Sequence, residues 1–143
     1  MTPRDTLTGV LLRATALGLA SGGRSSSGLS ALALRGPLPV PLPLTPRAVP
    51  WAVGGELLTD KLPVAPSRLS PPVLASRVAA GALCGLVVAR RAGAPPGVPV
   101  VAAGLAAAVA SALGVRWRAA HPGVRPALVE DAVSLALAAA AAR

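Results

Sequence analysis

The sequence has almost no aromatic residues: Phe and Tyr are absent, and Trp51 and Trp117 are the only two Trp among 143 residues. Soluble cores use aromatic side chains for much of their buried area, whereas helices packed in lipid can use small residues instead. Charged residues are also scarce, at 13% against about a quarter in a typical soluble domain. Together with 53% hydrophobic residues and a mean hydropathy of +0.64, this composition indicates a membrane protein.

Residues with catalytic or metal-binding chemistry are just as rare. Cys84 is the only Cys, which excludes an internal disulfide, and His121 is the only His. The sequence contains no Cys/His metal spacing, no GxxxxGK[ST] phosphate loop and no GxSxG turn. We therefore predict that the chain is not an enzyme and holds neither a metal nor a cofactor.

Acidic residues are outnumbered, with five Asp and Glu against 14 Lys and Arg, for a net charge of +9. The Arg residues are scattered, and no alternation of aromatic and basic residues marks a nucleic-acid surface. The predicted partner is the lipid bilayer rather than nucleic acid, and a second copy of the chain is a candidate partner.

Apolar segments alternate with proline-rich connectors along the whole chain. The run 98–115 has 18 residues without a charge, and the run 73–89 contains one charge, Arg77. We predict an all-α fold, a small polytopic membrane helical bundle with about four membrane-embedded helices in a single domain, 1–143. The apolar segments are 7–20, 28–35, 51–62, 73–89, 98–115 and 127–142, and the connectors are 36–50 and 63–72.

Two segments near the N-terminus, residues 7–20 and residues 21–28, each allow two structural interpretations. Residues 7–20 are predicted as the first membrane segment, with Gly18 and Gly22 spaced for close helix contact, or as a signal peptide cleaved after Ala20. Residues 21–28 are rich in Gly and Ser, which is typical of an exposed linker. They also fit a broken or re-entrant helix whose polar groups face a cavity inside the membrane domain.

Acidic residues occur at two points in the apolar sequence. Glu56 and Asp60 are four residues apart, on one face of a helix, and the pair Glu130–Asp131 opens the last apolar run. A carboxylate in the middle of a membrane costs about 2.5–3.5 kcal/mol, so it normally has a partner or a function. The candidate polar membrane cluster consists of Arg24, Glu56, Asp60, Lys61, Arg77, Glu130 and Asp131.

Less specific explanations exist for the same residues. Asp60 and Lys61 suit a membrane surface, and Glu56 with Arg77 suits a structural ion pair. Acids in the first turns of a helix, as predicted for Glu130–Asp131, also favour its positive terminus. Gly81 and Gly85 form a GxxxG step, which predicts close helix packing.

Four short motifs carry a resemblance to a known family. They are Gly-Gly-Arg at 22–24, Gly-Glu-Leu-Leu-Thr-Asp-Lys-Leu-Pro at 55–63, Arg-Val-Ala-Ala-Gly-Ala at 77–82 and Val-Glu-Asp at 129–131. With them the chain resembles, from about residue 8 to 141, the bacterial domain-of-unknown-function family four-one-two-six. The resemblance implies a small integral protein of the bacterial cell membrane without an assigned activity. The dense prolines in 36–50 and the short segment 64–76 depart from the family pattern.

Three functions are therefore considered. The first is an integral membrane protein for transport or permeation that uses the buried acidic and Arg cluster. The second is a membrane scaffold or assembly partner that packs through small-residue helix faces. The third is a secreted or soluble Ala-rich helical protein.

Overall fold

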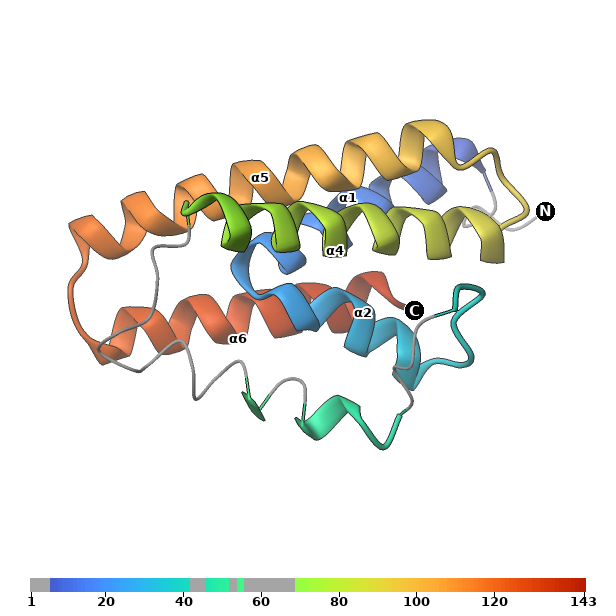
Figure 1. The fold of residues 1–143 in the computed structure, drawn as a ribbon. Helices are drawn as coiled ribbons and strands as arrows, with labels where there is room; N and C mark the ends of the chain where they lie inside the picture. The colour runs from blue at the N-terminus through green and yellow to red at the C-terminus, as the bar shows by residue number, and fades with distance from the viewer. Residues whose placement is uncertain (1–5, 42–45, 52–53, 56–68) are drawn as a thin grey trace.

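The computed structural model describes residues 6–41, 46–51, 54–55 and 69–143, and the regular structure in these ranges is helical. This confirms the all-α prediction. The helices that position the site are α1 (Leu7–Gly23), α2 (Ser25–Leu34), α4 (Pro71–Arg91), α5 (Gly97–Ala120) and α6 (Val124–Ala141) (Figure 1).

Local sequence explains where these helices begin and end. The Thr6 hydroxyl caps α1 by accepting a hydrogen bond from the Gly9 N–H at 3.2 Å. Pro71 and Pro72 occupy the first turn of α4, where the missing N–H costs nothing, so α4 begins inside the predicted connector 63–72. Gly123 has φ +126°, a backbone conformation that favours glycine, and it precedes α6.

The helix α1 lies at the centre of the bundle. The antiparallel helices α4 and α5 cover one side of it, and α6 and α2 lie on the other side, as Figure 1 shows. Val10, Ala14 and Leu17 of α1 are fully buried. Cys84 of α4 is equally buried and acts as a small apolar core residue, as its place in an apolar run indicates.

Glycines bring α1 and α4 into backbone contact with α5. A β-carbon at Gly18 or Gly22 of α1 would collide with the carbonyl oxygens of Ala103 or Ala107. On α4, a β-carbon at Gly81 would lie 2.7 Å from the Ala103 oxygen, and one at Gly85 would collide with the backbone of α5. The small-residue faces are thus used inside the bundle.

Two helices of the described part of the chain, α4 with 21 residues and α5 with 24, are long and apolar enough to cross a bilayer. The prediction of about four membrane-embedded helices is therefore not confirmed. At 1.5 Å per residue, the 17 residues of α1 and the 10 of α2 span only about 25 and 15 Å, against a hydrocarbon core of about 30 Å.

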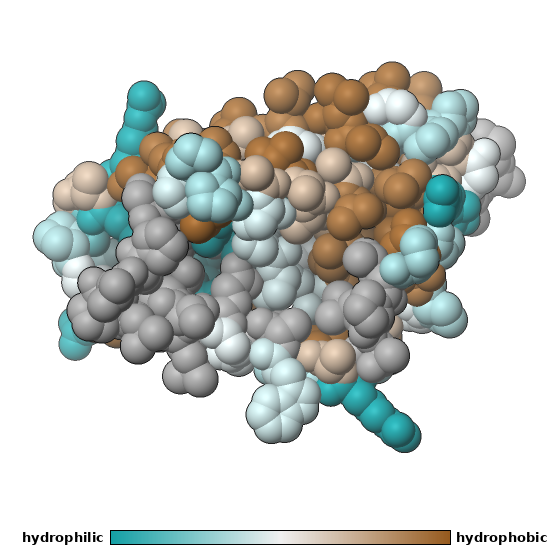
Figure 2. All heavy atoms as spheres, viewed as in Figure 1, coloured by the Kyte–Doolittle hydropathy of each residue, from teal (hydrophilic) through white to brown (hydrophobic). Residues whose placement is uncertain are grey.

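Apolar side chains also cover much of the outer surface. Along α5 they form a stripe with a spacing of three to four residues, and they gather along the upper edge of the molecule in Figure 2. We call this set the α5 stripe; its members are Val98, Val101, Leu105, Val109, Leu113 and Trp117. A continuous exposed apolar face of this kind marks a membrane or protein contact.

Because α1 and α5 are in backbone contact, adding one methyl group to a glycine at this contact should destabilise the protein, whereas the same change at a glycine with more space should not. Gly18→Ala should lower the free energy of unfolding by about 1–3 kcal/mol, because the β-carbon meets backbone that cannot move away. Gly104→Ala is the matched control, since its β-carbon would have 3.6 Å to its nearest neighbours. Unfolding in detergent, followed by circular dichroism, measures both, and equal effects would contradict this packing.

Candidate functional site

The chain breaks between α1 and α2 inside the bundle. Arg24 separates the two helices with an extended backbone, φ −150° and ψ 115°. The break lies beside Ala107 and Ser111, near the middle of α5, and beside Asp131 and Ser134, near the middle of α6. Ser27 and Gly28 after it are helical and buried, which excludes an exposed linker at 21–28 and agrees with a broken helix.

A helix that ends inside an apolar bundle must find partners for its last carbonyl groups. Arg77 of α4 supplies them with its Nη1, which donates to the Gly22 oxygen at 2.5 Å and to the Gly23 oxygen at 2.8 Å. Ser111 of α5 donates to the same Gly22 oxygen at 3.1 Å, and Ser27 of α2 donates to the Ala20 oxygen at 2.9 Å. Three other helices thus complete the C-terminus of α1.

The charge of Arg77 suits this position as well. The C-terminus of a helix carries a partial negative charge, and a guanidinium there is favourable, more so when it is buried. Arg77 is only 2% exposed. Its hydrogen bonds to Gly22 and Gly23 give this arginine a structural role at the break.

Arg24 and Asp131 form an ion pair in the interior. Nη2 of Arg24 lies 2.5 Å from Oδ1 of Asp131, and their side chains are 1% and 8% exposed. The pair joins the break to α6, near the opposite end of the sequence. Because two charges in a low-dielectric interior are costly to desolvate, burial alone makes this pair a candidate for function.

Arg24 also has hydrogen-bonding capacity left over. Its Nε and Nη1 are buried and have no acceptor among the residues that the structure describes. A buried N–H without an acceptor normally costs about 1–3 kcal/mol, or more when the group is charged. The capping of α1 does not explain why these two donors are buried.

The predicted cluster is brought together in part. Arg24, Arg77 and Asp131 converge on the break, whereas Glu130 points to the end of α5 and accepts a hydrogen bond from Arg118 Nε at 2.9 Å. Glu56, Asp60 and Lys61 lie outside the described residues.

The helix terminus does not explain the two acids of α6, Glu130 and Asp131. Because α6 begins at Val124, Glu130 and Asp131 are past its first turn, and the helix terminus does not account for them.

Two serines of the site were missed from the sequence. Ser111 is fully buried and bonds to Gly22, and Ser134 is buried with its hydroxyl so close to Gly23 that no β-carbon would fit there. A signal was present, because each is the only hydroxyl residue in its apolar run, 98–115 and 127–142. A single hydroxyl in an apolar helix often bonds across to a neighbouring helix.

No family model, no curated protein and no solved structure matches this chain. The resemblance to family four-one-two-six stays a prediction.

The arrangement suits charge chemistry better than covalent or metal chemistry. Within the described ranges, no three His, Cys, Asp or Glu side chains are grouped so that they could hold a metal ion. The break instead presents two guanidinium groups, one carboxylate and hydroxyl groups. Such a set can bind an anion or exchange a proton at Asp131.

Removing one member of the buried pair should cost more than removing both. Asp131→Asn leaves the Arg24 charge buried without its counter-ion, and we expect it to lower the free energy of unfolding by about 3–5 kcal/mol. The double variant Arg24→Met/Asp131→Leu should recover most of that loss. Unfolding of both variants in detergent tests this, and a double variant as unstable as the single one would contradict the ion pair.

Proposed function

We propose that this chain is an integral membrane protein that transports or permits passage of a small anion, with Arg24 at the break between α1 and α2 as its binding residue. One observation carries the proposal. Arg24 is buried in an apolar bundle, and one of its nitrogens contacts Asp131. Its other two nitrogens have no acceptor among the described residues.

The surroundings of Arg24 support a membrane setting. The helices α4 and α5 have the length and hydropathy of membrane spans, and the α5 stripe is exposed. A broken helix at membrane depth is tolerated where protein groups satisfy its backbone, as Arg77, Ser111 and Ser27 do here. Transporters commonly bind substrate at such breaks.

The charges favour an anion over a cation. Among the described residues, the break carries the positive charges of Arg24 and Arg77 and the single negative charge of Asp131. A metal cation would meet two guanidinium groups, whereas an anion could accept hydrogen bonds from Arg24 Nε and Nη1. A proton carried by Asp131 is the competing interpretation, and the flux assay below separates the two.

The other two functions are less well supported. A scaffold that packs through its small-residue faces would need them exposed, but Gly18, Gly22, Gly81 and Gly85 all lie against α5. A secreted or soluble protein released after Ala20 would lose most of α1, which supplies Val10, Ala14 and Leu17 to the core. We include membership of family four-one-two-six in this proposal, because small integral membrane proteins are what the resemblance implies.

Membrane insertion is the first expected outcome. After an alkaline carbonate wash, the tagged protein should stay in the membrane pellet, because α4 and α5 would be held by about 30 Å of hydrocarbon. A known peripheral protein serves as the control that the wash releases. Release of this chain into the supernatant would contradict membrane insertion and the transport proposal together.

Anion flux is the second expected outcome. In liposomes loaded with a chloride-sensitive dye, Arg24→Met/Asp131→Leu should reduce flux about tenfold or more, because charge-assisted hydrogen bonds to the anion are lost. The double change is used because it leaves no unpaired charge and should still fold. Arg90→Gln is the control: it removes one positive charge from the exposed end of α4 and should leave flux unchanged.

The same liposomes distinguish the anion from the proton. With impermeant gluconate as the only anion, an anion pathway gives no current, whereas a proton pathway through Asp131 still dissipates a pH gradient. Unchanged flux in the folded double variant, or proton flux independent of the anion supplied, would overturn the proposal.

A further inference from the structure

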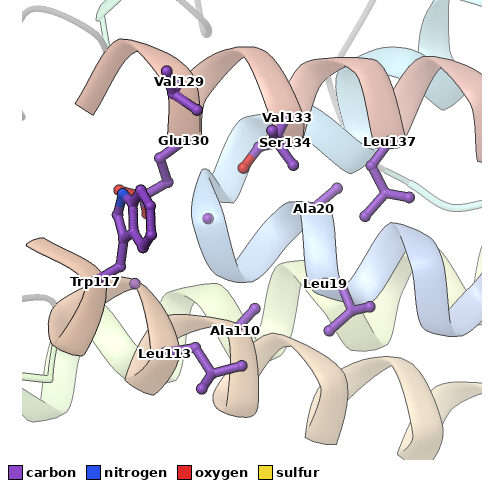
Figure 3. Close-up of a pocket in the computed structure, with 12 residues that line it drawn as sticks. Leu19, Ala20, Ala110, Leu113, Trp117, Val129, Glu130, Val133, Ser134 and Leu137 are labelled. Atoms are coloured by element: carbon purple, nitrogen blue, oxygen red, sulfur yellow. The ribbon is translucent and has the colours of Figure 1, made fainter. Parts of the chain in front are cut away.

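An apolar groove separates α5 from α6. These two helices touch at few points, and α1 forms the floor of the space between them. Leu113 of α5, Val133 and Leu137 of α6, and Leu19 of α1 line the groove (Figure 3). Its volume is about 390 Å³, within the roughly 300–1,000 Å³ of ligand sites.

One end of the groove is polar and basic. There Trp117 and Glu130 face each other from α5 and α6 in Figure 3, and Arg118 joins the two helices through its ion pair with Glu130 at 2.9 Å. Arg116 and Arg125 lie in the same ends of α5 and α6 and are exposed. No carboxylate of the described residues pairs with either arginine.

We infer that the groove binds one acyl chain of an anionic phospholipid, whose phosphate lies between Arg116 and Arg125. The apolar walls fit a hydrocarbon chain, and the two exposed arginines match the negative headgroup at the end where an amphipathic Trp also suits the headgroup region. The inference uses the membrane location of the proposed function but not anion transport.

The size of the groove argues against a peptide helix as its occupant. One helical turn, about 5 Å long and 10 Å wide, already takes up roughly 400 Å³, so the groove would hold a single turn. An acyl chain is narrower and can follow the groove along α5 and α6. The groove is also continuous with the exposed α5 stripe, which would lie in the same hydrocarbon.

Trp117 provides a direct probe, because it lines the groove and the only other Trp, Trp51, is 83% exposed. In the Trp51→Phe background, the protein is reconstituted in phosphatidylcholine with a small fraction of tail-brominated lipid, which quenches a nearby indole. Brominated phosphatidylglycerol should quench Trp117 at about tenfold lower mole fraction than brominated phosphatidylcholine, because two arginines favour the anionic headgroup.

Two pairs of variants separate the groove from general lipid contact. Arg116→Gln/Arg125→Gln should remove most of the tenfold preference, whereas Arg90→Gln, at the end of α4, should keep it. Ala110→Phe fills the groove from α5 and should reduce quenching by the anionic lipid, whereas Val109→Phe adds the same ring to the exposed stripe and should not.

The outcomes decide between a lipid site and bulk lipid. Equal quenching by the two brominated lipids, or a preference that survives the double Arg change, would overturn the inference. If Ala110→Phe does not fold, the Arg variants still test it, because they leave the groove walls intact. Lipid preference without anion flux would leave the inference standing and remove only the transport proposal.

Discussion

The structure depends on how the end of α1 satisfies its backbone in an apolar interior. A helix terminus without water leaves carbonyl groups that must be bonded by protein. Here α2, α4 and α5 each contribute one side chain, Ser27, Arg77 and Ser111, to the carbonyls of residues 20–23. Three helices are therefore fixed around α1 by hydrogen bonds to its last turn, and the buried charged side chains lie next to that turn.

The two arginines at the break, Arg77 and Arg24, differ in how their hydrogen-bond donors are used. Arg77 donates two hydrogen bonds to the last carbonyl groups of α1, and this capping explains its burial. Arg24 is different, because Asp131 takes only one of its nitrogens. A buried guanidinium with donors that no described residue accepts is costly to maintain, because those N–H groups have lost their hydrogen bonds to water.

Much of this could be predicted from the sequence. Long apolar runs predicted the helices, because hydropathy and length are local properties. The Gly- and Ser-rich stretch 21–28 fitted either an exposed linker or a broken helix, and the sequence did not decide between them. The pairing of Arg24 with Asp131 could not be chosen over Glu56 or Glu130, since it depends on how α6 packs against the break. Ser111 and Ser134 were missed because a lone serine in an Ala-rich helix looks neutral until its neighbour is known.

The Arg24–Asp131 pair also has a consequence for the synthesis of the protein. Asp131 follows Arg24 by 107 positions, so a ribosome makes the carboxylate roughly 5–20 s after it makes the guanidinium. During that interval Arg24 lacks its counter-ion, so burying it between α1 and α2 would carry the desolvation cost of an unpaired charge. Burial of Arg24 is therefore expected to wait for α6, and a chain truncated before residue 131 would contain an arginine that has no Asp131 to offset the cost of its burial.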